Sequence, residues 1–201
     1  MLKEKERAEI ARLWARKVDQ DARKLPQSER HRNLEPVSAE FISSLAAGIG
    51  AKRLLEIGGS SGISTIALAA AARETGGRLV SIEIEPKRQA EARETIQRLG
   101  LADYVEFVLA DAALVLPGYA EPFDFALIDC EKNDYVRFFD MIPAGPGRWL
   151  LPTTFFRTAS PITWHMYART AARNPSRSPS ARGWKSAFTP DKNRRCSCAV
   201  A

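Results

Sequence analysis

The stretch RLLEIGGSSGIS, residues 53–64, decides the fold of this chain. It begins with a short apolar run, Leu54, Leu55 and Ile57, which predicts a buried strand. Small residues follow, and the apolar-rich segment 63–72 then predicts a helix. A strand, a glycine turn and a helix in this order place a ligand at the carboxyl end of a parallel strand. Glycine lets the backbone turn sharply there and lets a ligand approach the main chain.

The spacing of this glycine loop narrows the class of ligand. The pattern E-x-G-x-x-x-G is formed by Glu56, Gly58, Gly59, Ser60, Ser61 and Gly62. A dinucleotide fold uses G-x-G-x-x-G, and a phosphate loop carries a lysine followed by Ser or Thr, and neither pattern is present. The loop therefore suits a ligand with less phosphate, such as a nucleoside. The alternative is a tight turn between strand and helix that binds nothing.

The rest of the chain alternates between strand-like and helix-like segments. Strands are predicted at residues 78–83, 104–109 and 123–129, and helices at 86–100, in a short turn after 110–112, and at 134–141. Before the loop, helices are predicted at residues 2–24 and from a cap at Ser38 through Ile49. This alternation predicts an α/β fold with a doubly wound, mostly parallel sheet.

Length and composition restrict the broad class of protein. A chain of 201 residues is expected to hold one main domain, and no apolar run is long enough for a membrane span. The charged N-terminus has no signal-peptide core, and three cysteines make no disulfide framework, so a reducing cytoplasm is expected. His31 lies in the polar linker ERHRN, where a solvated side chain is expected.

Four acidic residues lie at or just past the ends of four predicted strands. They are Glu56, Glu83, Asp111 and Asp129. The ligand crevice of a doubly wound sheet lies outside the carboxyl ends of its strands, so these acids should converge on one rim. Glu83 follows the glycines by about 20 residues, where an acidic residue accepts hydrogen bonds from ribose hydroxyls.

The segments LLEIGGSSGIS, SIEIEP, LADA and LIDCEKNDYVRFFD resemble the class I S-adenosylmethionine-dependent methyltransferases. More narrowly, residues 30–142 resemble the cation-dependent O-methyltransferases of the catechol and caffeoyl-CoA type. This resemblance implies that residues 56–64, including Ser64, cradle the methionine part of S-adenosylmethionine. It further implies that Glu83, beside Ile84, holds the ribose. Asp111 and Ala112 then lie at the adenine, and Leu34 covers the cofactor.

The same resemblance assigns the chemistry to the segment IDCEKNDY. Asp129 would be a Mg²⁺ ligand and a catalytic residue, and Lys132 would take the proton from the acceptor hydroxyl. A phenol has a pKa near about 10 and is mostly protonated at neutral pH. A divalent cation that touches the oxygen lowers this pKa. Tyr135 and Cys130 are expected to fill space rather than react.

The resemblance stops after Gly147. The family completes its metal site with an Asp-Asn pair after the next strand, and residues 148–201 contain no such pair. This tail carries ten Lys and Arg but a single acidic residue, Asp191, whereas the whole chain has a net charge of +6. We therefore expect a methyltransferase domain at 1–147, a basic, poorly ordered tail at 148–201, and a sheet whose final strands are missing or disrupted. The edge of the fourth strand should then be exposed, and the protein should be deficient in metal and weakly active or inactive.

Two interpretations of the tail remain. One is a basic arm whose interspersed Trp and Tyr residues stack on nucleic-acid bases. The other is a frame-shifted translation of the family's normal C-terminus. Read from the third nucleotide of the Arg148 codon, residues 148–168 can encode an apolar strand followed by Asp-Asn.

The expected function is transfer of a methyl group from S-adenosylmethionine to a hydroxyl of a small phenolic acceptor. A hydroxylated uridine in tRNA is an alternative acceptor by the same resemblance. A nicotinamide or other nucleotide binder, and a non-catalytic RNA-binding protein that keeps this fold, are the alternatives from other classes. A homodimer is expected by resemblance only, and no membrane partner is expected.

The frame-shift hypothesis predicts the coding DNA. In the shifted frame, the codons of Pro152, Thr153 and Thr154 should spell Asp-Asn directly after an apolar run. Sequencing this stretch checks the prediction. Any other pair of residues would contradict it and would favour the basic arm.

Overall fold

The core of the protein is a sheet of five parallel strands. The computed structural model describes residues 1–26, 29–143 and 149–152. The strands are β1 (Arg53–Ile57), β2 (Arg78–Glu83), β3 (Val105–Leu109), β4 (Phe125–Ile128) and β5 (Trp149–Pro152). Their order in the sheet is β3-β2-β1-β4-β5, and every pair is parallel. The predicted doubly wound α/β fold is confirmed, because the strand order reverses at β1.

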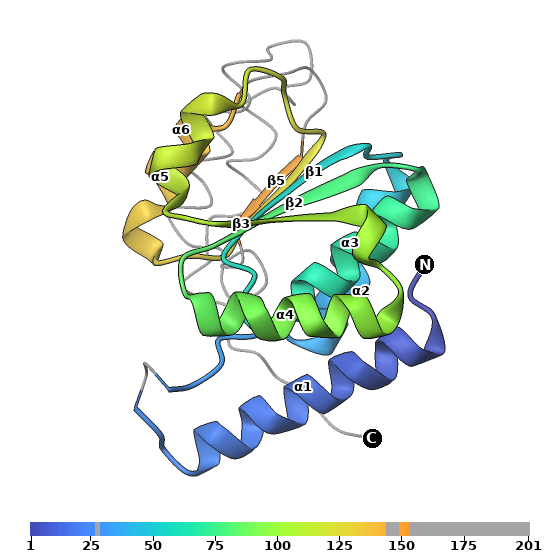
Figure 1. The fold of residues 1–201 in the computed structure, drawn as a ribbon, viewed down its shortest axis with the longest axis vertical. Coiled ribbons are helices and arrows are strands. Elements are labelled where there is room, and N and C mark those ends of the chain that lie inside the picture. The colour runs from blue at the N-terminus through green and yellow to red at the C-terminus, as the bar shows by residue number, and fades with distance from the viewer. Residues whose placement is uncertain (27–28, 144–148, 153–201) are drawn as a thin grey trace, which may run out of the picture. The chain divides into compact units, whose positions relative to one another are not determined.

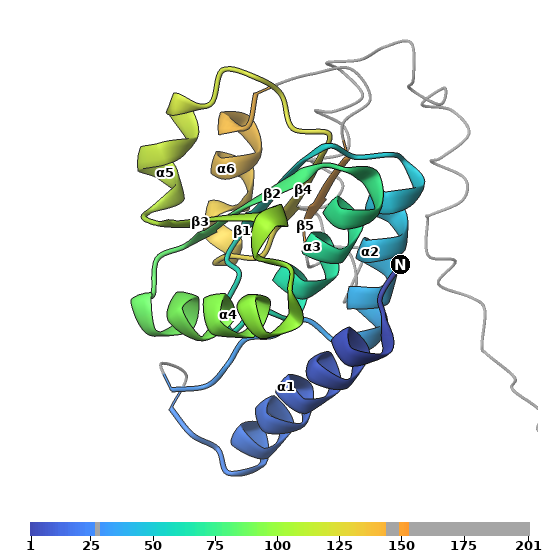
Figure 2. The same cartoon turned by 45° about the vertical axis from the view of Figure 1, so that its right-hand side comes forward.

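Helices cover both faces of this sheet (Figure 1). One face carries α3 (Ile63–Thr75) and α4 (Pro86–Leu99), with α2 (Pro36–Gly48) packed against α3, and α1 (Glu4–Ala22) packed against α2 and α3. The other carries α5 (Ala112–Val115) and α6 (Tyr135–Met141), as Figure 2 also shows. Short 3₁₀ turns, η1 (Ala102–Tyr104), η2 (Leu116–Gly118) and η3 (Lys132–Asp134), complete the connections.

Strand alternation divides the core between the two faces. Leu54 belongs to the cluster under α3, whereas Leu55 and Ile57 belong to the cluster under α6. Because both faces are covered, successive residues of β1 and β4 are buried on opposite faces of the sheet, which explains the run LLEI in the sequence. Glu56 interrupts this run and faces α3.

Two expectations for the N-terminal part are wrong. Helix α2 begins at Pro36 with Glu35 as its N-cap, so Ser38 lies buried inside the helix and does not cap it. Proline fits the first helical position because its missing N–H is not needed there. The His31 side chain is mostly buried rather than solvated, and its Nε2 lies 3.8 Å from Glu91 of α4.

The fourth strand of the chain is not the edge of the sheet. Residues 149–152 form β5, which pairs with β4 in the register Phe125 to Trp149 and Ile128 to Pro152. The expectation of an exposed edge beside β4 is therefore wrong. The remainder of the predicted tail from residue 153 onward, which includes Thr153 and Thr154 of the predicted Asp-Asn site, lies outside the described residues. Among the described helices, none is long and apolar enough to cross a membrane.

Ion pairs attach α1 to α4 through Glu9. This residue is only 8% exposed, and its Oε1 lies 2.7 Å from Arg12 Nη2 and 2.8 Å from Arg98 Nη2. The Arg12 guanidinium lowers the pKa of Glu9 to about 2, and Arg98 contributes in the same direction. Burial of the carboxyl group opposes this shift. Since this pKa is below its unfolded value of about 4.3, the pairs stabilise the fold above that pH and lose their effect as pH falls towards the folded value.

Replacing Glu9 by Gln should lower the free energy of unfolding by about 1–2 kcal/mol at neutral pH, since both arginines are half exposed. The difference from the wild-type protein should shrink as pH falls from about 4.5, because Glu9 then becomes protonated in the unfolded chain. Urea unfolding of both proteins over this pH range measures the difference in their free energies of unfolding. Glu4→Gln, an exposed change on the same helix, is the control. A difference that persists undiminished at the lowest pH would contradict the role of the charge.

Candidate functional site

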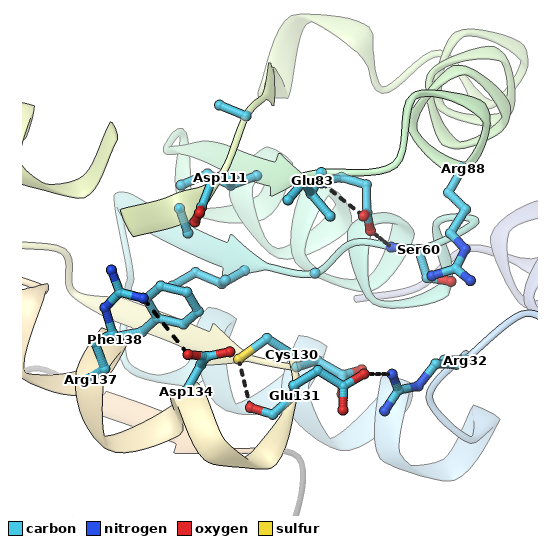
Figure 3. Close-up of a pocket in the computed structure, with 17 residues that line it drawn as sticks. Arg32, Ser60, Glu83, Arg88, Asp111, Cys130, Glu131, Asp134, Arg137 and Phe138 are labelled. Atoms are coloured by element: carbon cyan, nitrogen blue, oxygen red, sulfur yellow. Dashed lines mark hydrogen bonds and ion pairs between the residues drawn. The ribbon is translucent and has the colours of Figure 1, made fainter. Parts of the chain in front are cut away.

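A cavity of about 290 Å³ lies at the carboxyl ends of β1, β2, β3 and β4 (Figure 3). Seven of the residues predicted for the site line it: Gly58, Ser60, Glu83, Ile84, Asp111, Ala112 and Asp129. They come from four different strand ends, as expected for the ligand crevice of a doubly wound sheet. Of the predicted residues, Leu34, Glu56, Gly59, Ser61, Gly62 and Ser64 are not among those that line the cavity.

The floor of the cavity is a close approach between Gly58 and Asp129. The Gly58 N–H donates to Ile82 O at 2.8 Å, and the Asp129 N–H donates to Ile57 O at 2.8 Å. Gly58 has a φ of +91°, and a Cβ on it would overlap the backbone carbonyl of Asp129. Only glycine fits here, because the position needs both the left-handed backbone region and an absent side chain.

Glu56 lies beneath the glycine loop. Its carboxylate is fully buried, and Oε2 accepts hydrogen bonds from Thr65 Oγ1 at 2.7 Å and Ser81 Oγ at 2.6 Å. Burial raises the pKa of Glu56, and the hydrogen bonds from Ser64, Ser81 and Thr65 partly oppose the rise. A Cβ on Gly59 would lie 2.8 Å from Glu56 Oε2. Glu56 therefore shapes the loop from below, and its direct contact with a ligand stays a prediction.

Glu83 is held by three backbone donors. Its Oε2 accepts from Ser60 N at 2.8 Å, and its Oε1 accepts from Ile84 N at 2.9 Å and from Glu85 N at 3.0 Å. The carboxylate lines the cavity, although the residue is only 6% exposed. Backbone donors do not rotate away, so the orientation of this acceptor is set before any ligand arrives.

Ser60 combines backbone strain with an unused hydroxyl. Its φ is +48°, an uncommon value for a residue with a side chain. The conformation directs its N–H to Glu83. The Ser60 Oγ is buried and has no hydrogen-bond partner among the described residues. A strained residue with an unsatisfied polar atom in a cavity is typical of a ligand contact.

Asp111 closes the cavity on the side of β3. Its Oδ1 accepts from Ala113 N at 2.8 Å, so the side chain caps the short helix α5. Ala112 is buried and lines the cavity beside it. The small side chain leaves a flat surface next to an oriented carboxylate.

The segment before α2 reaches the glycine loop. Asn33 Nδ2 donates to Ser61 Oγ at 2.8 Å, and Ser61 Oγ donates to Asn33 Oδ1 at 3.0 Å. Leu34 is buried in the core under α3. Gly62 packs against Ala92 of α4, where a Cβ would lie 3.2 Å from the Ala92 Cβ. Ser61 and Gly62 therefore hold the loop in this structure, whereas Leu34 is a core residue.

Charged residues that the sequence patterns missed also line the cavity. They are Arg32, Arg88, Glu131, Asp134 and Arg137. Arg32 pairs with Glu131, and Arg137 Nη1 lies 3.9 Å from Asp134 Oδ1 (Figure 3). Glu131 and Asp134 belong to the segment IDCEKNDY after β4, but no role was predicted for them. The three arginines belong to no spaced motif, so no local signal marked them, and their position at the cavity depends on the tertiary fold.

Cys130 and Phe138 complete the wall near Asp129. Burial, assisted by the charges of Asp134 and Asp129, raises the pKa of Cys130 to about 12. The thiol is therefore protonated at neutral pH and is a poor nucleophile. Tyr135 is buried in the core under α6, as expected for a packing residue.

The predicted catalytic and metal residues are only partly described. Asp129 lines the cavity, and Lys132 begins η3 three residues later, so its backbone lies at the carboxyl end of β4. The Lys132 side chain lies outside the described part of the structure. Within the described residues, no three or more His, Cys, Asp or Glu residues are grouped to hold a metal ion. Asp129 alone does not make a three-ligand magnesium site.

Comparisons with known proteins point to one family. The family model described as O-methyltransferase matches residues 12–143. A catechol O-methyltransferase from Mycobacterium tuberculosis is 44% identical over 100 residues, which are 49% of this chain and 45% of the relative. A second, from Niastella koreensis, is 36% identical over 111 residues, 53% of this chain and 50% of the relative. The chain thus spans about half the length of these relatives.

A solved structure is similar over more of the chain. An O-methyltransferase from Bacillus cereus in complex with SAH is 26% identical, with a TM-score of 0.61. The similarity covers 88% of this chain and 81% of that one.

Replacing Gly58 by Ala should destabilise the protein by about 3–5 kcal/mol, since the new Cβ meets a backbone carbonyl and the left-handed conformation is strained. Gly48→Ala is the matched control, because a Cβ there meets nothing within 4 Å. That change should leave the stability unaltered or raise it by up to about 1 kcal/mol. Urea unfolding measures both. Equal effects of the two changes would show that the approach of Gly58 to Asp129 is not tight.

Proposed function

The chain belongs to the O-methyltransferase family of the catechol and caffeoyl-CoA type, and we propose that it binds S-adenosylmethionine and methylates a hydroxyl of a small phenolic acceptor. The observation that carries the proposal is the position of Glu83. It lines one cavity together with the glycine loop and Asp111, and three backbone N–H groups orient it. An acidic residue so placed, at the end of the second strand, accepts hydrogen bonds from ribose hydroxyls.

The residues of the cavity fit this cofactor. The buried Ser60 hydroxyl has no partner among the described residues, and the loop around Gly58 exposes bare backbone to the cavity. Among the described lining residues, the five acids Glu83, Asp111, Asp129, Glu131 and Asp134 outnumber the three arginines. An excess of negative charge favours a sulfonium cation and disfavours the pyrophosphate of a dinucleotide. This supports S-adenosylmethionine over NAD.

S-adenosylmethionine supplies an electrophilic methyl group when it is bound. The residues of this chain would hold and orient the reactants. Glu83 and the glycine loop would hold the cofactor on one side of the cavity, and Asp129 would face the acceptor hydroxyl on the other. Lys132, with its amine neutral, would accept the proton of that hydroxyl. The reactive oxygen would then attack in line with the methyl group, because both partners are held in one cavity.

Magnesium is proposed from the family alone. The described residues do not fit a complete magnesium site, since Asp129 lacks two further acidic or imidazole ligands arranged around it. Hard oxygen ligands are what Mg²⁺ requires, and Asp129 supplies one carboxylate. No catalytic step is therefore assigned to the metal.

Titration calorimetry with S-adenosylhomocysteine and with NAD tests the cofactor. The wild-type chain should bind S-adenosylhomocysteine and not NAD. Glu83→Gln should weaken this binding by about tenfold or more, because a charged acceptor for two hydroxyls is lost. Glu94→Gln, an exposed change on α4, is the control and should leave the affinity unchanged.

Binding of NAD alone would overturn the proposal. Equal affinity of Glu83→Gln and the wild-type protein would remove the observation on which it rests. Transfer of a labelled methyl group to catechol, with and without magnesium, tests the acceptor. A chain that binds S-adenosylhomocysteine but transfers no methyl group would retain only the cofactor half of the function.

A further inference from the structure

The segment between α1 and α2 is attached to four separate parts of the protein. Residues 30–33, called the clasp here, form neither helix nor strand. The His31 N–H donates to Gln20 Oε1 of α1 at 2.9 Å, and Arg88 Nη2 of α4 donates to Arg30 O at 3.4 Å. The last two residues of the clasp, Arg32 and Asn33, contact the two walls of the cavity.

Asn33 holds the first wall, which is the glycine loop. Two reciprocal hydrogen bonds join its side-chain amide to Ser61 Oγ, and both residues are buried, Asn33 at 7% exposure and Ser61 at 0%. In such a place an unsatisfied amide or hydroxyl is costly, so the pair forms and breaks as a unit. The clasp therefore stays on the loop only while the loop keeps this shape.

Arg32 holds the second wall, which is the segment directly after Asp129. Its guanidinium pairs with Glu131, and both residues line the cavity (Figure 3). Glu131 lies between Asp129 and Lys132 in the sequence, so a restraint on Glu131 also restrains its neighbours. Arg32 and Glu131 are partly exposed, which makes the pair easy to form or break without unfolding.

We propose that Arg32 and Asn33 are positioning residues, and that the clasp couples occupancy of the cofactor cavity to the placement of the segment 129–132. The inference rests on the proposed function. At the floor of the cavity, backbone hydrogen bonds already join the two walls, through Asp129 N to Ile57 O. Higher up, the clasp is a second link between them. Because adjacent residues hold opposite walls, a change in the loop is transmitted to the segment after β4.

A charge-swap experiment on the full chain tests this coupling. Arg32→Glu and Glu131→Arg should each weaken S-adenosylhomocysteine binding by at least threefold. The double variant, which restores an ion pair in reverse, should recover at least half of the logarithmic loss. Hydrogen exchange of the ligand-free proteins is the second measurement. In each single variant, amides 59–62 and 130–134 should exchange at least threefold faster, and in the double variant both groups should return towards the wild-type rate.

The Arg7–Glu40 pair is the matched control. It joins α1 to α2 with similar exposure, and neither residue lines the cavity. Arg7→Glu should change neither the affinity nor exchange at the two groups of amides. A merely structural role would lower thermal stability without the paired changes in exchange.

The outcomes separate the two proposals. If the wild-type chain does not bind S-adenosylhomocysteine, the proposed function fails, and the exchange measurement still decides whether the clasp links the walls. If the wild-type chain binds it, affinity changes below threefold in the single variants overturn the clasp. The clasp proposal is also overturned if the double variant loses as much affinity for S-adenosylhomocysteine as the two single variants lose together. Unaltered hydrogen exchange at either group of amides overturns it as well.

Discussion

The architecture of the site depends on the contact of Gly58 with the backbone of Asp129. A Cβ on Gly58 would overlap the Asp129 carbonyl, so β1 and β4 can end side by side only if this position has no side chain. The N–H groups of Gly58 and Asp129 continue the sheet hydrogen bonds to Ile82 and Ile57. The ends of three strands are thereby held together, and the acidic residues at those ends converge on one cavity.

A buried polar network supports this contact from below. Glu56 stands where the strand pattern calls for an apolar residue, and it joins β1 to α3 and β2 through Thr65 and Ser81. Gly59 leaves the space that the carboxylate needs. The buried Oε1 of Glu56 has no hydrogen-bond partner among the described residues, so the network is held through Oε2 alone. Because a buried polar group is costly without its partners, the two hydrogen bonds to Oε2 favour one loop conformation. Polar interactions therefore determine the shape of a loop that apolar packing alone would leave variable.

Under the proposed function, the described residues account for the cofactor side of the cavity more completely than for the acceptor side. The glycine loop, Glu83 and Asp111 are all placed around the cavity. Asp129 lines the cavity at the end of β4, and no group of three or more His, Cys, Asp or Glu residues that could hold a metal ion is found among the described residues. The two halves also differ in origin within the fold. The proposed cofactor contacts come from the first three strand ends, and the proposed acceptor side depends on β4 and on the segment after that strand.

The sequence by itself determined strands β1 to β4, the main helices and the convergence of Glu83, Asp111 and Asp129, because hydrophobic periodicity and glycine spacing are local properties of the chain. Tertiary structure alone decided that Glu56 lies under the loop, that Asn33 binds Ser61, and that Arg32 pairs with Glu131 across the cavity. It also decided that residues 149–152 cover the edge of β4. Such contacts join residues far apart in the chain, and no local pattern encodes which distant partner a polar side chain will meet.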